Sequence, residues 1–359
     1  MKKLFALLTI IVIVPCLGVI CHAEDEADKY LAEFENIIPS HMQSGITDGE
    51  ILQNSLGFEE ILSEILNAAS REKTKIFAFF FSLLGALVLL ALSSSFTGRF
   101  SGAVSAAVGC CVSVLIFSSV YGIYSSVSVA VSEANDFFVA LIPIAVGITS
   151  LGGGVFAAGV QSAGMSITAA AVSKLWGVAF TSVSGLGLSM SLISSYGGKG
   201  TATVAGWVKK SFGWILGIAT ALISGTLALQ TMVASARDSA AMRAARYAAS
   251  GLIPVIGSTV SGALATLASG ISYVKGIIGG GAVLVLISLL LSPLILLLIY
   301  RCALSFISFL ADFFEISSAK GIFGAYLYSL DTVVITYTLS CVVYVFEIIL
   351  FVKSGVALL

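Results

Sequence analysis

Long apolar runs alternate with short polar segments from residue 76 to the end of the chain. Ile76–Phe96 and Ile277–Tyr300 contain no charged residue, and each is long enough to cross a bilayer, which takes roughly 20 apolar residues. Further apolar stretches cover residues 103–124, Leu175–Ser195, Ser211–Val233 and Asp331–Val352, and another begins at Phe137. The pattern predicts an all-α polytopic membrane protein with seven or eight transmembrane helices.

Polar or glycine-rich segments are expected to separate these spans. Ser125–Asp136, Tyr196–Lys210 and Arg301–Lys320 are interpreted as connections, and Lys174 as an interruption. Gly152–Gly154, Gly251–Gly257 and Gly279–Gly281 are candidate helix breaks. The pattern leaves open whether Val155–Ser173 crosses the membrane, re-enters it or lies along its surface. The positive-inside rule does not decide the orientation beyond residue 150, because it favours neither span count.

The N-terminal part of the chain has a different character. Lys2 and Lys3, the apolar run Leu4–Val14 and Cys21-His22-Ala23 are typical of a secretory signal peptide over residues 1–23. An uncleaved signal anchor is the alternative. Residues 24–75 contain 12 acidic and four basic residues, and apolar positions between Phe58 and Ala69 recur at helical spacing. We expect a small acidic helical region outside the cytoplasm, followed by a membrane domain over 76–359.

The few polar residues narrow the chemistry. Only 10% of the chain is charged and 58% is hydrophobic. The sequence has no dense basic cluster interleaved with aromatics, so it does not predict nucleic-acid binding. Both histidines, His22 and His41, precede the membrane domain, which excludes a Ser–His pair within it. Gly187-Leu-Ser-Met-Ser191 departs from the G-x-S-x-G pattern at its last position, and the chain has no P-loop motif. We therefore expect no enzyme activity and no cofactor or metal.

Two sets of residues are candidates for function. Lys174, Asp331 and Glu347 are ionisable groups in or near spans, where charge is costly and often functional. The second set forms one basic segment that leads into a proline–glycine sequence: Arg237, Asp238, Arg243, Arg246, Gly251, Pro254 and Gly257. This segment is interpreted either as an interfacial helix with a hinge or as a docking element. A secondary transporter with broken helices is the alternative function.

Small residues at helical spacing indicate close helix packing. Gly213 and Gly217, and likewise Gly276 and Gly280, are spaced to let two helices approach closely. Such packing fits one chain or several copies, so a homo-oligomer stays open.

The chain resembles the stage III sporulation protein AE family of endospore-forming bacteria. The likeness lies in an acidic exported region with Gly57-Phe-Glu-Glu-Ile-Leu62, the Arg237–Tyr247 turn, Ala249-Ser-Gly-Leu-Ile-Pro-Val-Ile-Gly-Ser-Thr-Val-Ser-Gly262 and Lys275-Gly-Ile-Ile-Gly-Gly280. It implies a non-enzymatic component of the channel or secretion-like complex that joins mother cell and forespore. The resemblance places the protein in the mother-cell membrane around the forespore. The partners it implies are membrane proteins of the same complex, including an ATPase and ring-forming subunits.

Overall fold

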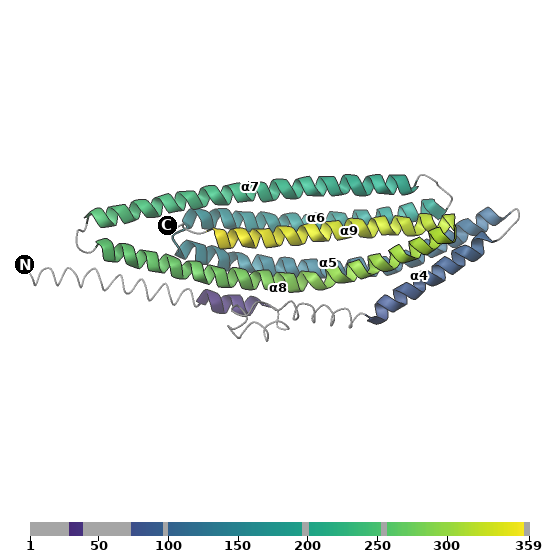
Figure 1. Ribbon diagram of the computed structural model, residues 1–359, viewed down its shortest axis with the longest axis horizontal. Helices are drawn as coiled ribbons and strands as arrows, with labels where there is room; N and C mark the ends of the chain where they lie inside the picture. The colour runs from purple at the N-terminus through teal and green to yellow at the C-terminus, as the bar shows by residue number, and fades with distance from the viewer. Residues whose placement is uncertain (1–28, 39–72, 96–99, 196–200, 253–256, 355–359) are drawn as a thin grey trace, which may run out of the picture.

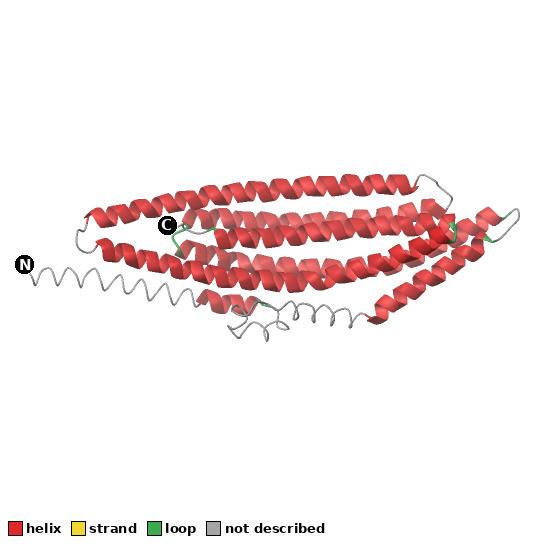
Figure 2. Ribbon diagram, in the orientation of Figure 1, coloured by secondary structure: helices red, strands yellow, loops and turns green. Residues whose placement is uncertain are grey.

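The structure, a computed structural model, describes residues 29–38, 73–95, 100–195, 201–252 and 257–354. All regular elements in these residues are helices (Figure 2). A short helix at 29–37 precedes six long ones, which are α4 (Lys73–Ser94), α5 (Ser101–Leu151), α6 (Val155–Ser195), α7 (Thr201–Leu252), α8 (Gly257–Phe313) and α9 (Ser317–Lys353). The predicted all-α class is confirmed. The signal peptide and the helix predicted between Phe58 and Ala69 lie outside the described residues.

Helices α5 to α9 form an elongated antiparallel bundle, and α4 packs obliquely against one end of it (Figure 1). α9 lies among α6, α7 and α8, so it is the central helix of the bundle. α7 and α8 extend beyond the other helices at the end of the bundle where α9 ends (Figure 1). Since α7 and α9 both begin at the opposite end, these two neighbours run parallel.

All six long helices are apolar enough to span a membrane, a number close to the seven or eight predicted. α5 has 51 residues and α8 has 57, which at 1.5 Å per residue gives about 76 and 85 Å. A hydrocarbon core is only about 30 Å thick. Each of these two helices therefore extends well beyond one bilayer thickness if it stands upright.

The predicted connection Ser125–Asp136 was wrong, because this segment is an uninterrupted part of α5. Glu133 and Asp136 are exposed, while Val127, Val131 and Ala134 are buried on the opposite face. A helix accommodates scattered charges in this way when they share its outer face. The polar residues of this segment form an exposed stripe on the helix and do not interrupt it.

The other predicted interruptions are wholly or partly helical. Lys174 is exposed on α6, which joins Val155–Ser173 to the following span as one helix. The predicted connection Arg301–Lys320 is reduced to residues 314–316. Most of the predicted connection Tyr196–Lys210 is also helical, because α7 begins at Thr201. Of the candidate glycine breaks, Gly279–Gly281 is continuous helix within α8.

The break at Gly152–Gly154 is confirmed as the turn between α5 and α6. Gly153 has a φ of 78°, a left-handed conformation that glycine adopts without the steric cost that a side chain brings. The turn reverses the chain in three residues and places the first turn of α6 beside the last turn of α5.

Hydrogen bonds across the bundle connect α9 with its neighbours. The hydroxyl groups of Tyr124 and Ser329 lie 2.7 Å apart, and Tyr326 donates to the carbonyl oxygen of Ser113 at 2.6 Å. Tyr337 donates to the carbonyl oxygen of Leu290 at 2.7 Å. In lipid, such bonds and close packing replace the hydrophobic effect as the forces between helices.

Candidate functional site: a polar junction of five helices

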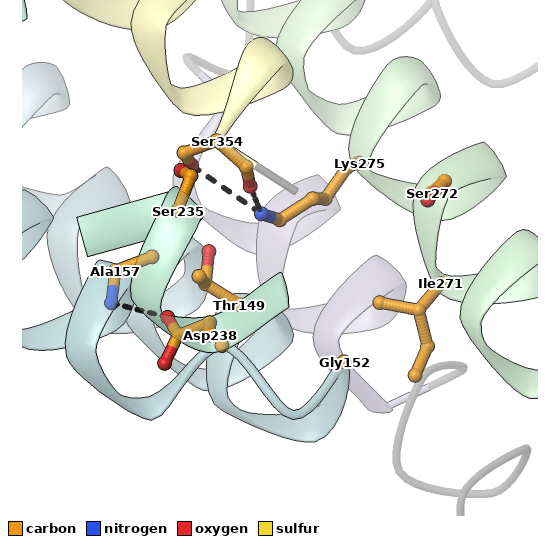
Figure 3. A pocket seen from close by; sticks show the side chains of 10 residues that line it. Thr149, Gly152, Ala157, Ser235, Asp238, Ile271, Ser272, Lys275 and Ser354 are labelled. Carbon is orange, nitrogen blue, oxygen red and sulfur yellow. Dashed lines mark hydrogen bonds between the residues drawn. The ribbon is translucent and has the colours of Figure 1, made fainter. Parts of the chain in front are cut away.

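Polar side chains from five helices meet near the end of the bundle where α5 and α9 end and α6 begins. The cluster is lined by residues of α5 (Thr149), the turn after it (Gly152), α6 (Ala157), α7 (Ser235, Asp238), α8 (Ile271, Ser272, Lys275) and the residue after α9 (Ser354), as Figure 3 shows. We call this cluster, together with Gln161 of α6, the polar junction. It brings together segments up to about 200 residues apart in the chain.

Asp238 joins α7 to the start of α6. Asp238 is 3% exposed. One of its carboxylate oxygens accepts the backbone N–H of Ala157 at 2.7 Å (Figure 3), and the other accepts that of Phe156 at 3.2 Å. The first N–H groups of a helix have no partner within the helix, and the positive end of its dipole favours a carboxylate. Asp238 therefore caps α6 from another helix.

The neighbouring arginine covers the same helix start from outside. The guanidinium of Arg237 lies 4.3 Å from the centre of the Phe156 ring, within the range of a cation–π contact. Arg237 is exposed, and Arg243 is exposed further along α7. The predicted basic segment thus begins with two adjacent residues that both hold the first turn of α6.

Lys275 connects α8 with the end of α9. Its side chain is 3% exposed and its ammonium group donates to the backbone carbonyl oxygen of Ser354, with the Ser354 hydroxyl at 3.4 Å (Figure 3). The ammonium also lies 5.4 Å from the centre of the Phe351 ring. The last carbonyl groups of a helix lack partners and attract cations. Lys275 therefore satisfies the C-terminal end of α9.

Gln161 links the remaining helices. Its side-chain oxygen lies 3.0 Å from the Thr149 hydroxyl and 3.3 Å from the Ser354 hydroxyl. Gln161 and Thr149 are both buried. The amide thus bridges the end of α5 and the end of α9 from the second turn of α6.

The cavity inside the junction is small. Its volume is about 10 Å³, close to the minimum that holds a single water molecule. The Ser235 hydroxyl at its wall has no hydrogen-bond partner among the described residues, which suits one bridging water. The junction is thus built to hold helix ends together, and its cavity has no room for a substrate.

Comparison with protein families identifies the chain. The family model for stage III sporulation protein AE matches residues 39–354, which includes every residue of the polar junction. The chain belongs to the stage III sporulation protein AE family. The resemblance seen in the sequence is confirmed. No significant match was found among curated proteins or solved structures.

In this family member, the residues of the predicted interaction segment lie in two places. Asp238 and Arg237 lie at the junction, whereas Arg243, Arg246 and Gly251 belong to the part of α7 that extends past it. Gly257 begins α8, and Pro254 lies outside the described residues. The structure therefore connects the first two residues of the segment with the helix bundle.

The three predicted intramembrane polar residues are not brought together. Lys174 is exposed on α6, and Asp331 of α9 forms an ion pair with Arg301 of α8. Glu347 is 4% exposed, and its Oε2 atom has no hydrogen-bond partner among the described residues. Asp331 and Glu347 are 16 residues apart on one helix, or about 24 Å. They do not form a dyad.

Sequence reasoning missed Lys275, Gln161 and Thr149 as site residues. Lys275 has a signal in the sequence, since it is the last charge before the most apolar span. Gln161 also has a signal in the sequence, because it is an amide in a segment otherwise built of small and apolar residues. Neither signal shows which partner the side chain meets, because the partners are far away in the chain.

Proposed function

We propose that this protein is a non-enzymatic membrane component of the complex that joins mother cell and forespore during sporulation. The observation that carries the proposal is the family match over residues 39–354. Among the described residues, six helices are long and apolar enough to span a membrane, which agrees with a multi-pass component of a channel or secretion-like assembly. The junction supports a structural role, because its polar groups are used to tie helix ends together.

The proposed location is the mother-cell membrane that surrounds the forespore. The proposed partners are membrane proteins of the same complex, including an ATPase and ring-forming subunits, and further copies of this chain. We propose two contact surfaces, the acidic region of residues 24–75 and the segment Arg237–Gly257. The segment extends from the junction to the overhanging end of α7 (Figure 1), which leaves that end accessible to a partner.

Deletion of the gene in a sporulating host tests the proposal. We expect forespores to stop developing after engulfment, and the parent gene to restore heat-resistant spores. A variant with Arg243→Glu should fail to rescue and should co-purify with fewer partners, while Lys174→Glu, also exposed but on α6, should rescue. Normal sporulation of the deletion strain would reject the proposal.

A secondary transporter is the second candidate, and Glu347 is the observation that favours it. Its buried Oε2 atom has no hydrogen-bond partner among the described residues, which is costly in an apolar surrounding, and such carboxylates often mark ion pathways. Uptake of a solute by purified protein in liposomes, lost on Glu347→Gln or Lys174→Ala, would support this candidate over the first.

A further inference from the structure

A groove on the outer surface of the bundle runs between α7 and α9. It has a volume of about 680 Å³. One wall comes from Lys210, Gly213, Trp214, Gly217, Ile218 and Ala221 of α7. Tyr328 and Ile335 of α9 form the other. The lining is mostly apolar, and its polar side chains are Lys210 at one end and Tyr328 on α9.

The two glycines predicted to pack against a helix line this groove instead. A Cβ atom added at Gly213 or Gly217 would meet no atom within 4 Å. Among the described residues, no helix fills the space that the glycine spacing provides. Because a surface groove in a membrane does not stay empty, lipid or another protein chain occupies it.

Lys210 marks the level of the groove in the bilayer. It is the last charge before the uncharged run 211–236 of α7, so its ammonium belongs at the headgroup level. Trp207 and Trp214 are 69% and 65% exposed, and tryptophan is enriched at this interface. Within the part of the chain that the structure describes, no acidic side chain pairs with Lys210.

The length of the groove matches one leaflet. From Lys210 to Ala221 the helix rises about 16 Å, which is half of a hydrocarbon core about 30 Å thick. The groove thus begins at a cation in the headgroup layer and ends near the bilayer midplane. A phospholipid has this geometry, with an anionic phosphate at one end and an acyl chain of leaflet length.

We propose that the groove between α7 and α9 binds one acidic phospholipid. Its phosphate pairs with the Lys210 ammonium and one acyl chain lies over Gly213 and Gly217. Charge complementarity favours a lipid over a transmembrane helix, because among the described lining residues Lys210, at one end, is the charged side chain and the others are apolar apart from Tyr328. The proposal is independent of the role in sporulation.

Fluorescence quenching at Trp214 tests the proposal at the site itself. The chain has three tryptophans, so Trp176→Phe and Trp207→Phe leave Trp214 as the only one. The protein is reconstituted in phosphatidylcholine vesicles that contain increasing fractions of brominated phosphatidylglycerol or brominated phosphatidylcholine. We expect half-maximal quenching at a fraction at least fivefold lower for the acidic lipid.

Two variants in this background separate the possible results. Lys210→Ala should remove the fivefold preference, and Gly217→Leu should weaken quenching by the acidic lipid. Lys174→Ala, which removes an exposed lysine away from the groove, should change neither and serves as the matched control. Equal quenching by both lipids in the parent would overturn the proposal in favour of bulk lipid. Absence of quenching by either would overturn it in favour of a second copy or a partner helix.

Discussion

α7 and α9 are parallel neighbours of similar chemistry, yet one lies at the edge of the bundle and the other at its centre. Of the most apolar 18 residues of each helix, 44% are buried in α9 and 11% in α7. α7 exposes large side chains such as Trp214, Leu222 and Met232. Hydrophobicity therefore does not decide which helix is central.

Polar contacts and close approaches distinguish the two helices. α9 carries Ser329, Asp331 and Tyr337, each with a partner on another helix. α7 has Asp238 as its polar anchor on α6. Since lipid solvates apolar side chains as well as a protein interior does, hydrogen bonds and packing select the helix that is enclosed.

The largest effect is expected from Asp331→Leu in α9. The change leaves the Arg301 guanidinium without its carboxylate in an apolar stretch of α8, and an unpaired charge there is strongly destabilising. The Arg301 side chain is 41% exposed, so the cost is that of an unpaired arginine facing lipid, and we expect the free energy of unfolding, measured by SDS titration in bicelles, to fall by about 2.5 kcal/mol. The double variant Arg301→Leu with Asp331→Leu should recover at least half of that loss. Equal losses for the single and the double variant would contradict this reading of the pair.

Asp238→Ala should release α7 from α6 with a smaller effect. Two backbone N–H groups lose a charged acceptor, which costs about 2 kcal/mol. Amide hydrogen exchange should rise at Phe156 and Ala157 and stay unchanged around Ser329. Asp238→Asn keeps one acceptor oxygen and should lose less. A uniform rise in exchange along α6 and α9 would argue against a local anchor.

Much of the architecture could be predicted from the sequence, because bilayer thickness and backbone hydrogen bonding leave few alternatives to helices in long apolar runs. The errors in the prediction concern where one helix ends and the next begins. Glu133 and Asp136 suggest a connection in the sequence, but they lie on the exposed face of α5. A linear pattern does not distinguish an outward stripe of charges from a break, since both place polar letters between apolar ones.

The candidate site could be predicted only in part. The sequence points to Asp238 because this residue lies in a distinctive basic segment, although its role as a cap depends on the start of α6, about 80 residues earlier. Lys275 gave a weaker signal, and its partner Ser354 lies 79 residues away. Such contacts follow from how helices pack, and the spacing of small residues did not reveal that packing, because Gly213 and Gly217 face a groove.

Gly187→Ala tests the close approach of α6 and α9. An added Cβ atom would lie 2.9 Å from the Ser329 hydroxyl oxygen and 3.0 Å from its Cβ atom. We expect a loss of about 1.5 kcal/mol in the free energy of unfolding from overpacking. Gly185→Ala is the matched control on the same helix, since a Cβ atom there meets nothing within 4 Å. If both variants behave alike, close packing does not distinguish α9 from α7.

The smallest effect is expected from Tyr326→Phe in α9. The change removes the hydroxyl that donates to the Ser113 carbonyl oxygen at 2.6 Å and that lies 3.1 Å from the Ser191 hydroxyl. Hydrogen bonds between helices in membranes contribute about 0.6 kcal/mol on average, so we expect a loss of that size in the same titration. Tyr121→Phe on α5, at an exposed tyrosine, should have no effect. A loss as large as that of Asp331→Leu would contradict this order of effects, because the tyrosine bond would then stabilise the position of α9 as strongly as the ion pair does.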